Sequence, residues 1–444
     1  MPMSIIPHVS DAMQTVLTTT TETVAATLGY VKRADRATFT PSTLVQTLVY
    51  GWLANPTASL GQLAQMAARV GATVSPQAID RRFTLATVDL LHHVLLASME
   101  YAISADPVAV SILQRFTSVR IHDSTTIGLP DALATTYRGC GNASARGTAG
   151  LKCGVQLDLL TGTLCGIDLT DGRASDQVLS VQRAPLPAGS LRLADLGFYN
   201  IRIFRELAAA EVYWLSRVQS HSRIRLPGQK EQSILEVVTG LGDADHWEGT
   251  VLVGSKERLA ARLLVQRVPD AVAAQRRQRV QDEAHDKCRP VSNAAMDLAA
   301  WTVVITNAPE DKLGLTEAMV LLKMRWQIEL LFKLWKSHGH VDEWRTKKPA
   351  RILCEIYAKL LGLVFQQWIL VASAWDTAER SLFKAAQIVM AYATDLASSR
   401  GCREQLETVL TTLASIIGRL ARVQKRQKRP STAQRLLALT AGSG

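Results

Sequence analysis

The sequence has few cysteines, and they follow no pairing pattern. The six cysteines include no CxxC pair and show no knuckle-like spacing with the nine histidines, which argues against a zinc site. This distribution also provides no disulfide framework, so we expect a reduced, cytosolic protein. The cysteines are Cys140, Cys153, Cys165, Cys288, Cys354 and Cys402.

Targeting and membrane-spanning segments are also missing. The N-terminal residues MPMSIIPHVSDAMQTV lack the basic region and apolar core of a secretory signal. The most apolar stretch, Leu360 to Ala374, is interrupted by Gln366 and Gln367 and falls short of the roughly 20 residues that span a bilayer. We therefore expect a buried helix there and no membrane partner. A GxxxxGK[ST] phosphate loop is absent, which argues against an ATP-driven helper protein.

Chain length and net charge give the first indications of the class of protein. The chain has 444 residues, enough for two or three domains and a core with a buried sheet. Lys and Arg outnumber Asp and Glu by 50 to 39, a net charge of +11, which suits a partner with many phosphates. Many soluble proteins with no nucleic-acid role are equally basic, so the motifs must decide.

The segment 41–101 has apolar residues at spacings of three and four, which predicts helices. Within it, SLGQLAQMAARVG predicts a short helix, and Ser75 and Pro76 begin a second one as N-cap and first helical residue. Two short helices around a glycine turn resemble a helix-turn-helix whose second helix carries Arg81 and Arg82. An ordinary helical hairpin with solvated arginines explains the pattern equally well.

The pattern changes at Ser118, where VRIHDSTTI alternates and is rich in β-branched residues, as a strand does. GLKCGVQLDLLTGTLCGIDL predicts a hairpin that turns at Gly162, and three successive strands imply antiparallel pairing. SLRLADLG predicts a fourth strand with Asp195 at its end. NIRIFRELAAA then predicts a helix, and VYWLSRVQ returns to strand. Strands and helices therefore alternate in this part of the chain.

Between about Ser222 and Ala299 the chain reads as an irregular insertion with a strand pair, HWEGTVLVG and ARLLVQRVP, and a very charged run from 275 to 289. WTVVITNAP predicts a strand, and a long helix begins near Thr316. The remainder is helical. A basic run, RVQKRQKRP at 422–430, fits either a solvated tail or a DNA-binding arm.

Three carboxylates, Asp123, Asp195 and Glu329, fall on elements that are distant in sequence but could meet at one edge of a sheet. Phosphodiester cleavage uses a hard cation held by a few oxygens, and two-ion sites hold their metals roughly 3.5 to 4 Å apart. Each strand-end aspartate alone fits an ordinary turn cap. Together the three residues predict a metal site.

The helix that carries Glu329 offers the most specific motif. At about 100° per residue, Glu329 and Lys336 lie about 40° and 20° from Arg325 around the helix axis, so one stripe carries a carboxylate between two cations. A solvated Arg-Glu pair explains this spacing too. RWQIELLFKLWKS, however, resembles the Tyr-Arg-Glu-Lys signature, Tyr-x2-Arg-x3-Glu-x6-Lys, of insertion-sequence DDE transposases. Leu322 stands at the signature's Tyr position.

The resemblance extends to IHDSTTIGLP around Asp123 and LADLGFYN around Asp195. It implies an α/β fold with a ribonuclease-H-like catalytic core and a β-rich insertion, flanked by all-helical N- and C-terminal regions. The expected domains are a helical N-terminal DNA-binding region (1–117), the first part of the core (118–221), the insertion (222–299), the last core strand and catalytic helix (300–345), and a helical C-terminal region (346–444).

The resemblance implies a cut-and-paste transposase of the hairpin-forming bacterial subgroup. Asp123, Asp195 and Glu329 would hold Mg²⁺, with Mn²⁺ as a substitute. Arg325 and Lys336 would position phosphates. The implied partners are the double-stranded DNA of element ends and target, and a second copy of the chain in a homodimer on DNA. The implied location is the cytoplasm, at the nucleoid.

Two further DNA-binding positions follow from the same resemblance. Trp301, before the last core strand, would hold a base flipped from the hairpin intermediate by stacking. Core packing is the alternative for Trp301, and Trp247 competes for its role. Arg217 resembles a DNA-contacting arginine of the family, and a solvated strand residue is its alternative.

Two other functions remain open, and two other sites are disfavoured. A catalytically inactive, transposase-derived repressor would bind element ends, and a plain metal-dependent nuclease would cut without joining. A Ser-His-Asp relay is improbable in His122, Asp123 and Ser124, because consecutive strand residues alternate faces. His338 and His340 fit a solvated loop better than a metal pair.

Overall fold

The computed structural model describes residues 5–30, 39–141, 148–286 and 288–423, with 434, 435 and 438. The chain forms two compact units. The helix-rich unit comprises Met1–Ala109, Ser124–Ala174 and Gln327–Gln434, and the sheet unit comprises Val110–Asp123, Ser175–Trp326 and Arg435–Gly444. Both units combine strands and helices, so the protein belongs to the mixed α/β class.

Strand β1 (Val119–Leu129) contributes residues to both units. In the sheet unit, β1 and β4 pair in parallel, and β4 and β5 pair in parallel. Strand β10 is antiparallel to both β5 and β9. The strands of this unit, in their order across the sheet, are β1, β4 (Leu191–Ala194), β5 (Tyr213–Arg217), β10 (Trp301–Thr306), β9 (Leu259–Arg267), β8 (His246–Val253), β6 (Arg223–Arg225) and β7 (Glu231–Ser233). The strands expected around both aspartates, in the insertion and at Trp301 are confirmed.

Helices of the sheet unit begin at polar caps. Asn200 accepts hydrogen bonds from two amides at the start of α8 (Ile201–Ala209), and Ser233 forms a capping box at α9 (Ile234–Thr239). The charged run that was expected to be irregular lies mostly in a helix, α10 (Asp270–Asp286). The irregular expectation was wrong, because this helix is polar on nearly every side and has no apolar stripe to mark it.

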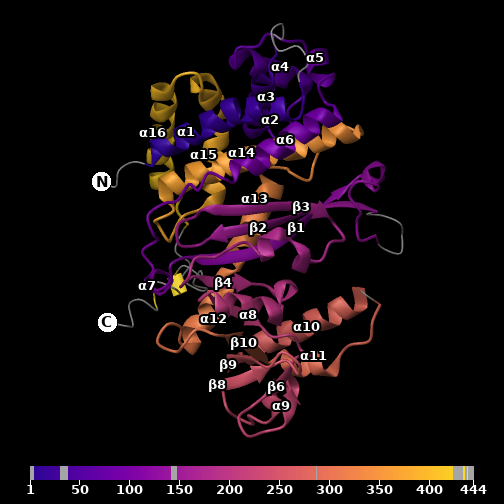
Figure 1. Cartoon of the computed structure of the whole chain (residues 1–444), viewed down its shortest axis with the longest axis vertical. Helices are drawn as coiled ribbons and strands as arrows, with labels where there is room; N and C mark the ends of the chain where they lie inside the picture. The colour runs from indigo at the N-terminus through magenta and orange to yellow at the C-terminus, as the bar shows by residue number, and fades with distance from the viewer. Residues whose placement is uncertain are drawn as a thin grey trace. The chain divides into compact units, whose positions relative to one another are not determined.

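The insertion shares a hydrophobic core with α8 and β5 of the sheet unit. The Phe204 and Trp214 rings stack with centroids 4.6 Å apart, and buried residues of β6, β8, β9 and α9 complete the cluster. Figure 1 shows α9, α10 and α11 (Asn293–Leu298) with strands β6, β8, β9 and β10 in this region. All of β10 pairs with β9, a strand of the insertion. The insertion and β10, the strand before α12 (Leu315–Met324), therefore belong to one continuous sheet.

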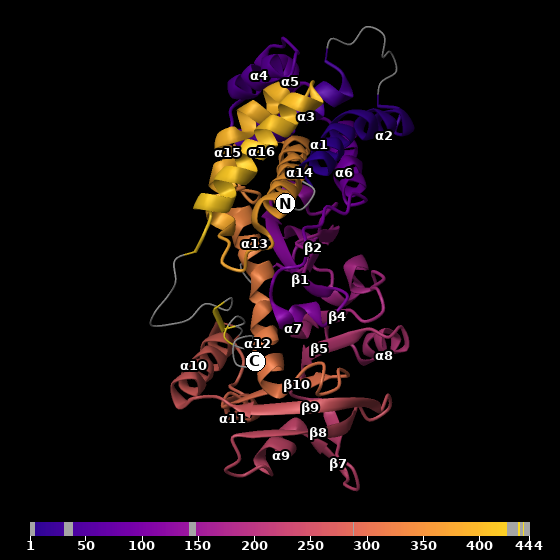
Figure 2. The same ribbon diagram turned by 90° about the vertical axis from the view of Figure 1, so that its left-hand side faces the viewer.

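The helix-rich unit is organised around α14 (Pro349–Ala374), which packs against α3 (Pro41–Ala54), α6 (Leu85–Ser98) and α16 (Arg403–Leu420). Figure 2 shows α15 (Leu382–Ser399) and α16 beside α14. Helix α14 has 26 residues and is long and apolar enough to cross a membrane, but 89% of its most apolar window is buried inside the protein. The expected buried helix is confirmed.

Strands β2 (Ala149–Asp158) and β3 (Leu164–Asp171) form the expected antiparallel hairpin in the helix-rich unit. Gly162 turns it with a φ of +79°, a conformation that favours glycine. A Cβ at Gly162 would lie 2.3 Å from the Trp375 ring, and the Gly162 carbonyl accepts a hydrogen bond from Gln367. Both contacts tie the hairpin to the helices of its unit.

The N-terminal helix pair is present, with a very short second member. Helix α4 (Leu60–Arg69) is followed by α5 (Pro76–Asp80), which Ser75 caps as expected. Helix α5 has five residues, and Arg81 lies at its C-cap. One turn and a half is short for a recognition helix in a major groove, which favours the ordinary helical hairpin.

The long helix expected from Thr316 is divided at Arg325. Helix α12 ends at Met324 and α13 begins at Trp326, and Arg325 between them keeps right-handed helical angles of φ −49° and ψ −30°. The expectation of one uninterrupted helix was therefore wrong at this residue. No residue type in the sequence marks the break, because neither Gly nor Pro occurs from Leu315 to Ser337.

Candidate active site

Two parallel pairings place β1, β4 and β5 side by side in the sheet unit. His122 of β1 is level with Ala194, the last residue of β4, and Ala194 is level with Ser216 of β5. The next residue along the chain is Asp123 within β1, Asp195 directly after β4, or Arg217 at the end of β5. Neighbouring strands lie about 4.8 Å apart, and level residues share a face. The two aspartates and Arg217 therefore form a row at one edge of the sheet.

The Arg325 guanidinium joins the two carboxylates. Its Nη1 donates to Asp123 Oδ2 at 2.8 Å, and its Nε lies 3.8 Å from Asp195 Oδ1. The Arg325 and Asp123 side chains are 17% and 16% exposed, whereas Asp195 is 40% exposed. A cation between two like charges offsets their repulsion. Asp195 is thus the more accessible acid of the pair.

The segment after Asp195 is held by glutamines that the sequence did not single out. Gln182 donates to the Phe198 carbonyl and Gln177 to the Tyr199 carbonyl, both at 3.1 Å. Gln182 also accepts a hydrogen bond from the buried Arg192 of β4. Burial lowers the pKa of Arg192 to about 10. These bonds fix the turn that presents Asp195, and because the two glutamines lie in short 3-10 turns, no periodic pattern could reveal them.

Glu329 and Lys336 lie on α13 (Trp326–Ser337), in the helix-rich unit. Both side chains are partly exposed, while Ile328 and Trp335 are buried. Lys336 donates its ammonium hydrogen to the Thr126 carbonyl of β1 at 3.0 Å. Helix α13 is therefore hydrogen-bonded to the part of β1 that belongs to the same unit.

The remaining expected DNA-binding positions have structural contacts of their own. Trp301 and Trp247 both pack, partly buried, against the core of the insertion. The Arg267 guanidinium lies over the Trp301 ring at 4.6 Å, and Arg217 is exposed. Leu322, at the signature's Tyr position, is only 8% exposed. The packing role considered as the alternative for Trp301 is thus present. The Trp301 ring also stacks against a planar cation, the Arg267 guanidinium.

The disfavoured constellations have other partners. His122 is completely buried, and burial with nearby Arg192 holds its pKa well below the usual value. His340 Nδ1 lies 3.0 Å from Glu343, and His338 packs edge-on against Phe383. The basic run at 422–430 lies almost entirely outside the described residues.

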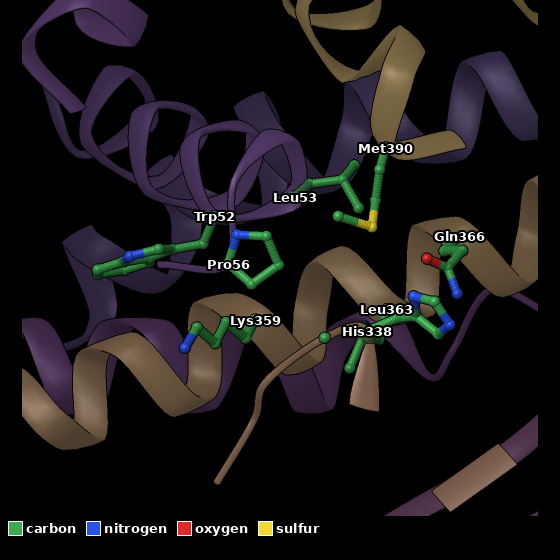
Figure 3. A pocket seen from close by; sticks show the side chains of 9 residues that line it. Trp52, Leu53, Pro56, His338, Lys359, Leu363, Gln366 and Met390 are labelled. Carbon is green, nitrogen blue, oxygen red and sulfur yellow. The ribbon is translucent and has the colours of Figure 1, made fainter. Parts of the chain in front are cut away.

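A pocket in the helix-rich unit offers no competing site (Figure 3). Its lining includes Trp52, Leu53, His338 and Lys359. The Lys359 ammonium is engaged by the Glu355 carboxylate at 2.9 Å and by two backbone carbonyls at 2.8 Å. A lysine with three such partners has no donor left for a ligand.

The carboxylate oxygens at the sheet edge suit a divalent cation, since hard cations prefer oxygen ligands. Arg325 already places one positive charge between Asp123 and Asp195. Among the described residues, no group of three or more His, Cys, Asp or Glu side chains gathers into a metal site. The fold and this edge define an α/β protein with a two-aspartate, oxygen-donor centre.

Comparison with known proteins identifies the family. The family described as "Transposase DDE domain" matches residues 114–365. The transposase for insertion sequence element IS231F of Bacillus thuringiensis subsp. israelensis is 26% identical over 380 residues, 80% of this chain and 78% of that protein. The transposase for IS1151 of Clostridium perfringens is 24% identical over 71% of each chain. A putative transposase, InsL for IS186A of Escherichia coli (strain K12), is 28% identical over 50% of this chain and 61% of its own length.

The chain belongs to the DDE transposase family, since the match covers more than half of its length. It is similar to the transposases of the insertion sequences IS231F and IS1151, and as a DDE transposase it is an enzyme that catalyses DNA cleavage and strand transfer. DNA is therefore its substrate, and the family implies a divalent metal ion.

The ion pairs of Arg325 make a prediction about metal response. Arg325→Gln should lower the free energy of unfolding without metal by roughly 1–2 kcal/mol, because Asp123 and Asp195 lose the cation between them. Millimolar Mg²⁺ should then raise the melting temperature more in the variant than in the wild type. Thermal unfolding with and without Mg²⁺ measures both effects.

The matched control for this prediction is Arg115→Gln in the same unit. Arg115 makes a bidentate ion pair with Glu317, with both contacts at 2.8 Å, and this pair includes neither of the two aspartates. This control should lose stability without gaining any response to Mg²⁺. An equal Mg²⁺ response in wild type and Arg325→Gln would show that Arg325 does not offset the repulsion of the carboxylates.

Proposed function

We propose that this transposase excises and integrates an insertion sequence by a cut-and-paste route, with a hairpin at the element end as intermediate. Asp123, Asp195 and Glu329 are the proposed catalytic residues and hold Mg²⁺, for which Mn²⁺ can substitute. The observation that carries the proposal is that His122 and Ala194, the residues directly before the two aspartates, are level on adjacent parallel strands. The assignment of Glu329 rests on the Arg-x3-Glu-x6-Lys motif within the matched family region.

We propose a ribonuclease-H-like core for the catalytic region, with residues 222–299 as its β-rich insertion. Three features support this fold: the β2-β3 hairpin that follows β1, the parallel β1, β4 and β5, and the position of Asp195 directly after β4, the neighbour of the strand that carries Asp123. The flanking regions 1–117 and 346–444 are helical where they are described. We assign DNA binding to the N-terminal region as part of the same proposal.

The proposed chemistry is nucleophilic attack at phosphorus. A divalent cation in such a site stabilises negative charge on phosphate oxygens and promotes the nucleophile. The protein's own groups orient the substrate. Asp123 and Asp195 set the position of the ligand oxygens. The hydrogen bonds from Gln177 and Gln182 to the turn after Asp195 hold the Asp195 oxygens in place relative to those of Asp123. Water attacks the phosphodiester at the element end, and the 3′ oxygen leaves as a hydroxyl. This 3′ hydroxyl then attacks a phosphodiester of the opposite strand, whose own 3′ oxygen leaves, and the new bond closes the hairpin.

Four residues are proposed to bind DNA. Arg325, Lys336 and Arg217 contact phosphates, and the Trp301 ring stacks on the base flipped from the hairpin. The exposure of Arg217 and the planar partner already on Trp301 support these roles. We propose that a homodimer assembles on the DNA, and that the enzyme works at the nucleoid in the cytoplasm.

The test is Mg²⁺-dependent cleavage of a labelled duplex that carries the element's own ends, comparing wild type with Glu329→Gln at the same salt. Nicks and hairpins at the ends should appear on a denaturing gel with the wild type and vanish with the variant. Leu322 favours a second candidate, an inactive end-binding repressor. Binding of the ends without any cutting in Mg²⁺ or Mn²⁺ would establish that repressor instead.

A further inference from the structure

Five cationic side chains gather on the sheet unit beside the candidate active site. We call them the cationic cluster. Its members are Arg217 at the end of β5, Arg276 and Arg279 of α10, Lys323 of α12, and Arg435. They come from four separate parts of the chain, so only the tertiary structure brings them together.

Backbone register and hydrogen bonds locate the cluster. Arg276 donates to the Trp301 carbonyl at 2.8 Å and to Thr302 Oγ1 at 3.1 Å. Arg217 is level with Val304 on the neighbouring strand, and Thr302 and Val304 share a face of β10. Arg276 and Arg217 therefore lie over the same face of the sheet.

The other members approach the same place. Nearby Arg217 and Arg279 lower the pKa of Arg276, after the larger effect of burial. Nearby Arg435 and Arg276 lower the pKa of Lys323, again after burial. Helix α12, which carries Lys323, packs against β5. The five positive charges are thus close enough to repel one another.

Carboxylates do not neutralise this repulsion. Within the described part of the chain, no ion pair involves any of the five side chains. Four members, Arg217, Arg279, Lys323 and Arg435, are exposed. An exposed group of mutually repelling cations favours a polyanion that contacts several of them at once.

We propose that the cationic cluster binds the sugar-phosphate backbone of the DNA strand that runs on from the phosphodiester held at Asp123 and Asp195. This inference rests on the proposed function of that site. Arg217 and Asp195 follow Ser216 and Ala194, which are level on neighbouring strands about 4.8 Å apart. The cationic cluster is therefore adjacent to the carboxylates. Its spread over β5, α10 and α12 suits a series of phosphates rather than one small anion.

The matching experiment compares two variants of equal charge change. Arg279→Gln with Lys323→Gln removes two exposed cations of the cluster. Arg202→Gln with Lys230→Gln is the control, because both residues are exposed on the same unit and lie outside the cluster. Arg202 lies on α8, whose Phe204 stacks on Trp214, a residue of the opposite sheet face to Arg217.

The measurement is fluorescence anisotropy of a labelled duplex of arbitrary sequence, titrated with full-length protein at several salt concentrations. The slope of log K against log salt should be shallower by about 1.8 in the cluster variant than in the wild type, about 0.9 for each lost phosphate contact. The control should keep the wild-type slope. The charge reversal Lys323→Glu should weaken binding to the duplex more than the neutral substitution Lys323→Gln. Thermal unfolding verifies that each variant is folded.

The outcomes separate this inference from the proposed function. If the folded cluster variant keeps the wild-type slope of log K against log salt, the cluster does not bind DNA, and the proposed cleavage function is unaffected. If the cluster variant has a shallower slope but the wild type never cleaves its element ends, the cluster binds DNA and the proposed function is wrong. A wild type that does not bind DNA would overturn both.

Discussion

Asp195→Asn and Asp123→Asn should each lower DNA strand cleavage by about 10³-fold or more, while both variants still bind DNA. The amide keeps the size of the side chain but loses the charge and one of the two ligand oxygens. Loss of a metal ligand forfeits several kcal/mol of transition-state stabilisation, and about 4 kcal/mol corresponds to 10³ in rate. Initial cleavage rates on a labelled element end, with anisotropy for binding, measure the two effects.

The control is Asp243→Asn, an exposed aspartate of the same unit that precedes β8, the fourth strand from β4 across the sheet. It should cleave at the wild-type rate. Asp123 pairs with Arg325 at 2.8 Å, so Asp123→Asn should also lose some stability, whereas the more exposed Asp195 should lose less. Wild-type cleavage by either variant would remove that residue from the catalytic set.

Lys359→Met should destabilise the helix-rich unit by about 3–5 kcal/mol, the cost of leaving one partner of a buried ion pair alone. The side chains of Lys359 and Glu355 are 2% and 5% exposed, and their charged atoms lie 2.9 Å apart on α14. Lys359 also satisfies the carbonyls of His340 and Glu343. Urea unfolding at pH 7 measures the change.

This destabilisation should depend on pH. Burial already raises the pKa of Glu355, against the opposing effect of Lys359, and removal of Lys359 should raise it further. A carboxyl whose folded pKa exceeds its unfolded value binds its proton more tightly in the folded state. The variant should therefore be least destabilised below pH 4.5 and lose stability as the pH rises through the folded pKa of Glu355.

The control for the ion pair is the double variant Glu355→Met with Lys359→Met. It removes both buried charges, so it should be more stable than Lys359→Met alone and lack the pH dependence. Arg403→Gln, which breaks the exposed pairs with Glu407 and Asp11, should change stability far less than Lys359→Met does. Equal stabilities of the single and double variants would show that the charge left on Glu355 is not what destabilises the protein.

Sequence patterns predicted the strands around the two aspartates correctly, because these segments alternate and contain many β-branched residues. The same patterns failed at α10, because an almost wholly polar helix has no apolar residues at helical spacing. They also failed at Arg325, because no Gly or Pro marks the end of α12. The roles of Asp123, Asp195 and Glu329 came from motif resemblance, and they stay predictions. The glutamines behind Asp195 had no signal, since loop residues that bind carbonyls follow no periodicity.

The sequence by itself determined the family, the strand that contains Asp123, the strand that ends before Asp195, and the excess of basic residues. Local patterns are enough for these features because each depends on a short segment or on a sum over the chain. The tertiary structure decided that Asp123, Asp195 and Arg217 are level across three strands and that Arg325 joins the two carboxylates. It also decided which of the 50 Lys and Arg residues gather without acidic partners, because register and helix packing set distances between charges that are remote along the chain.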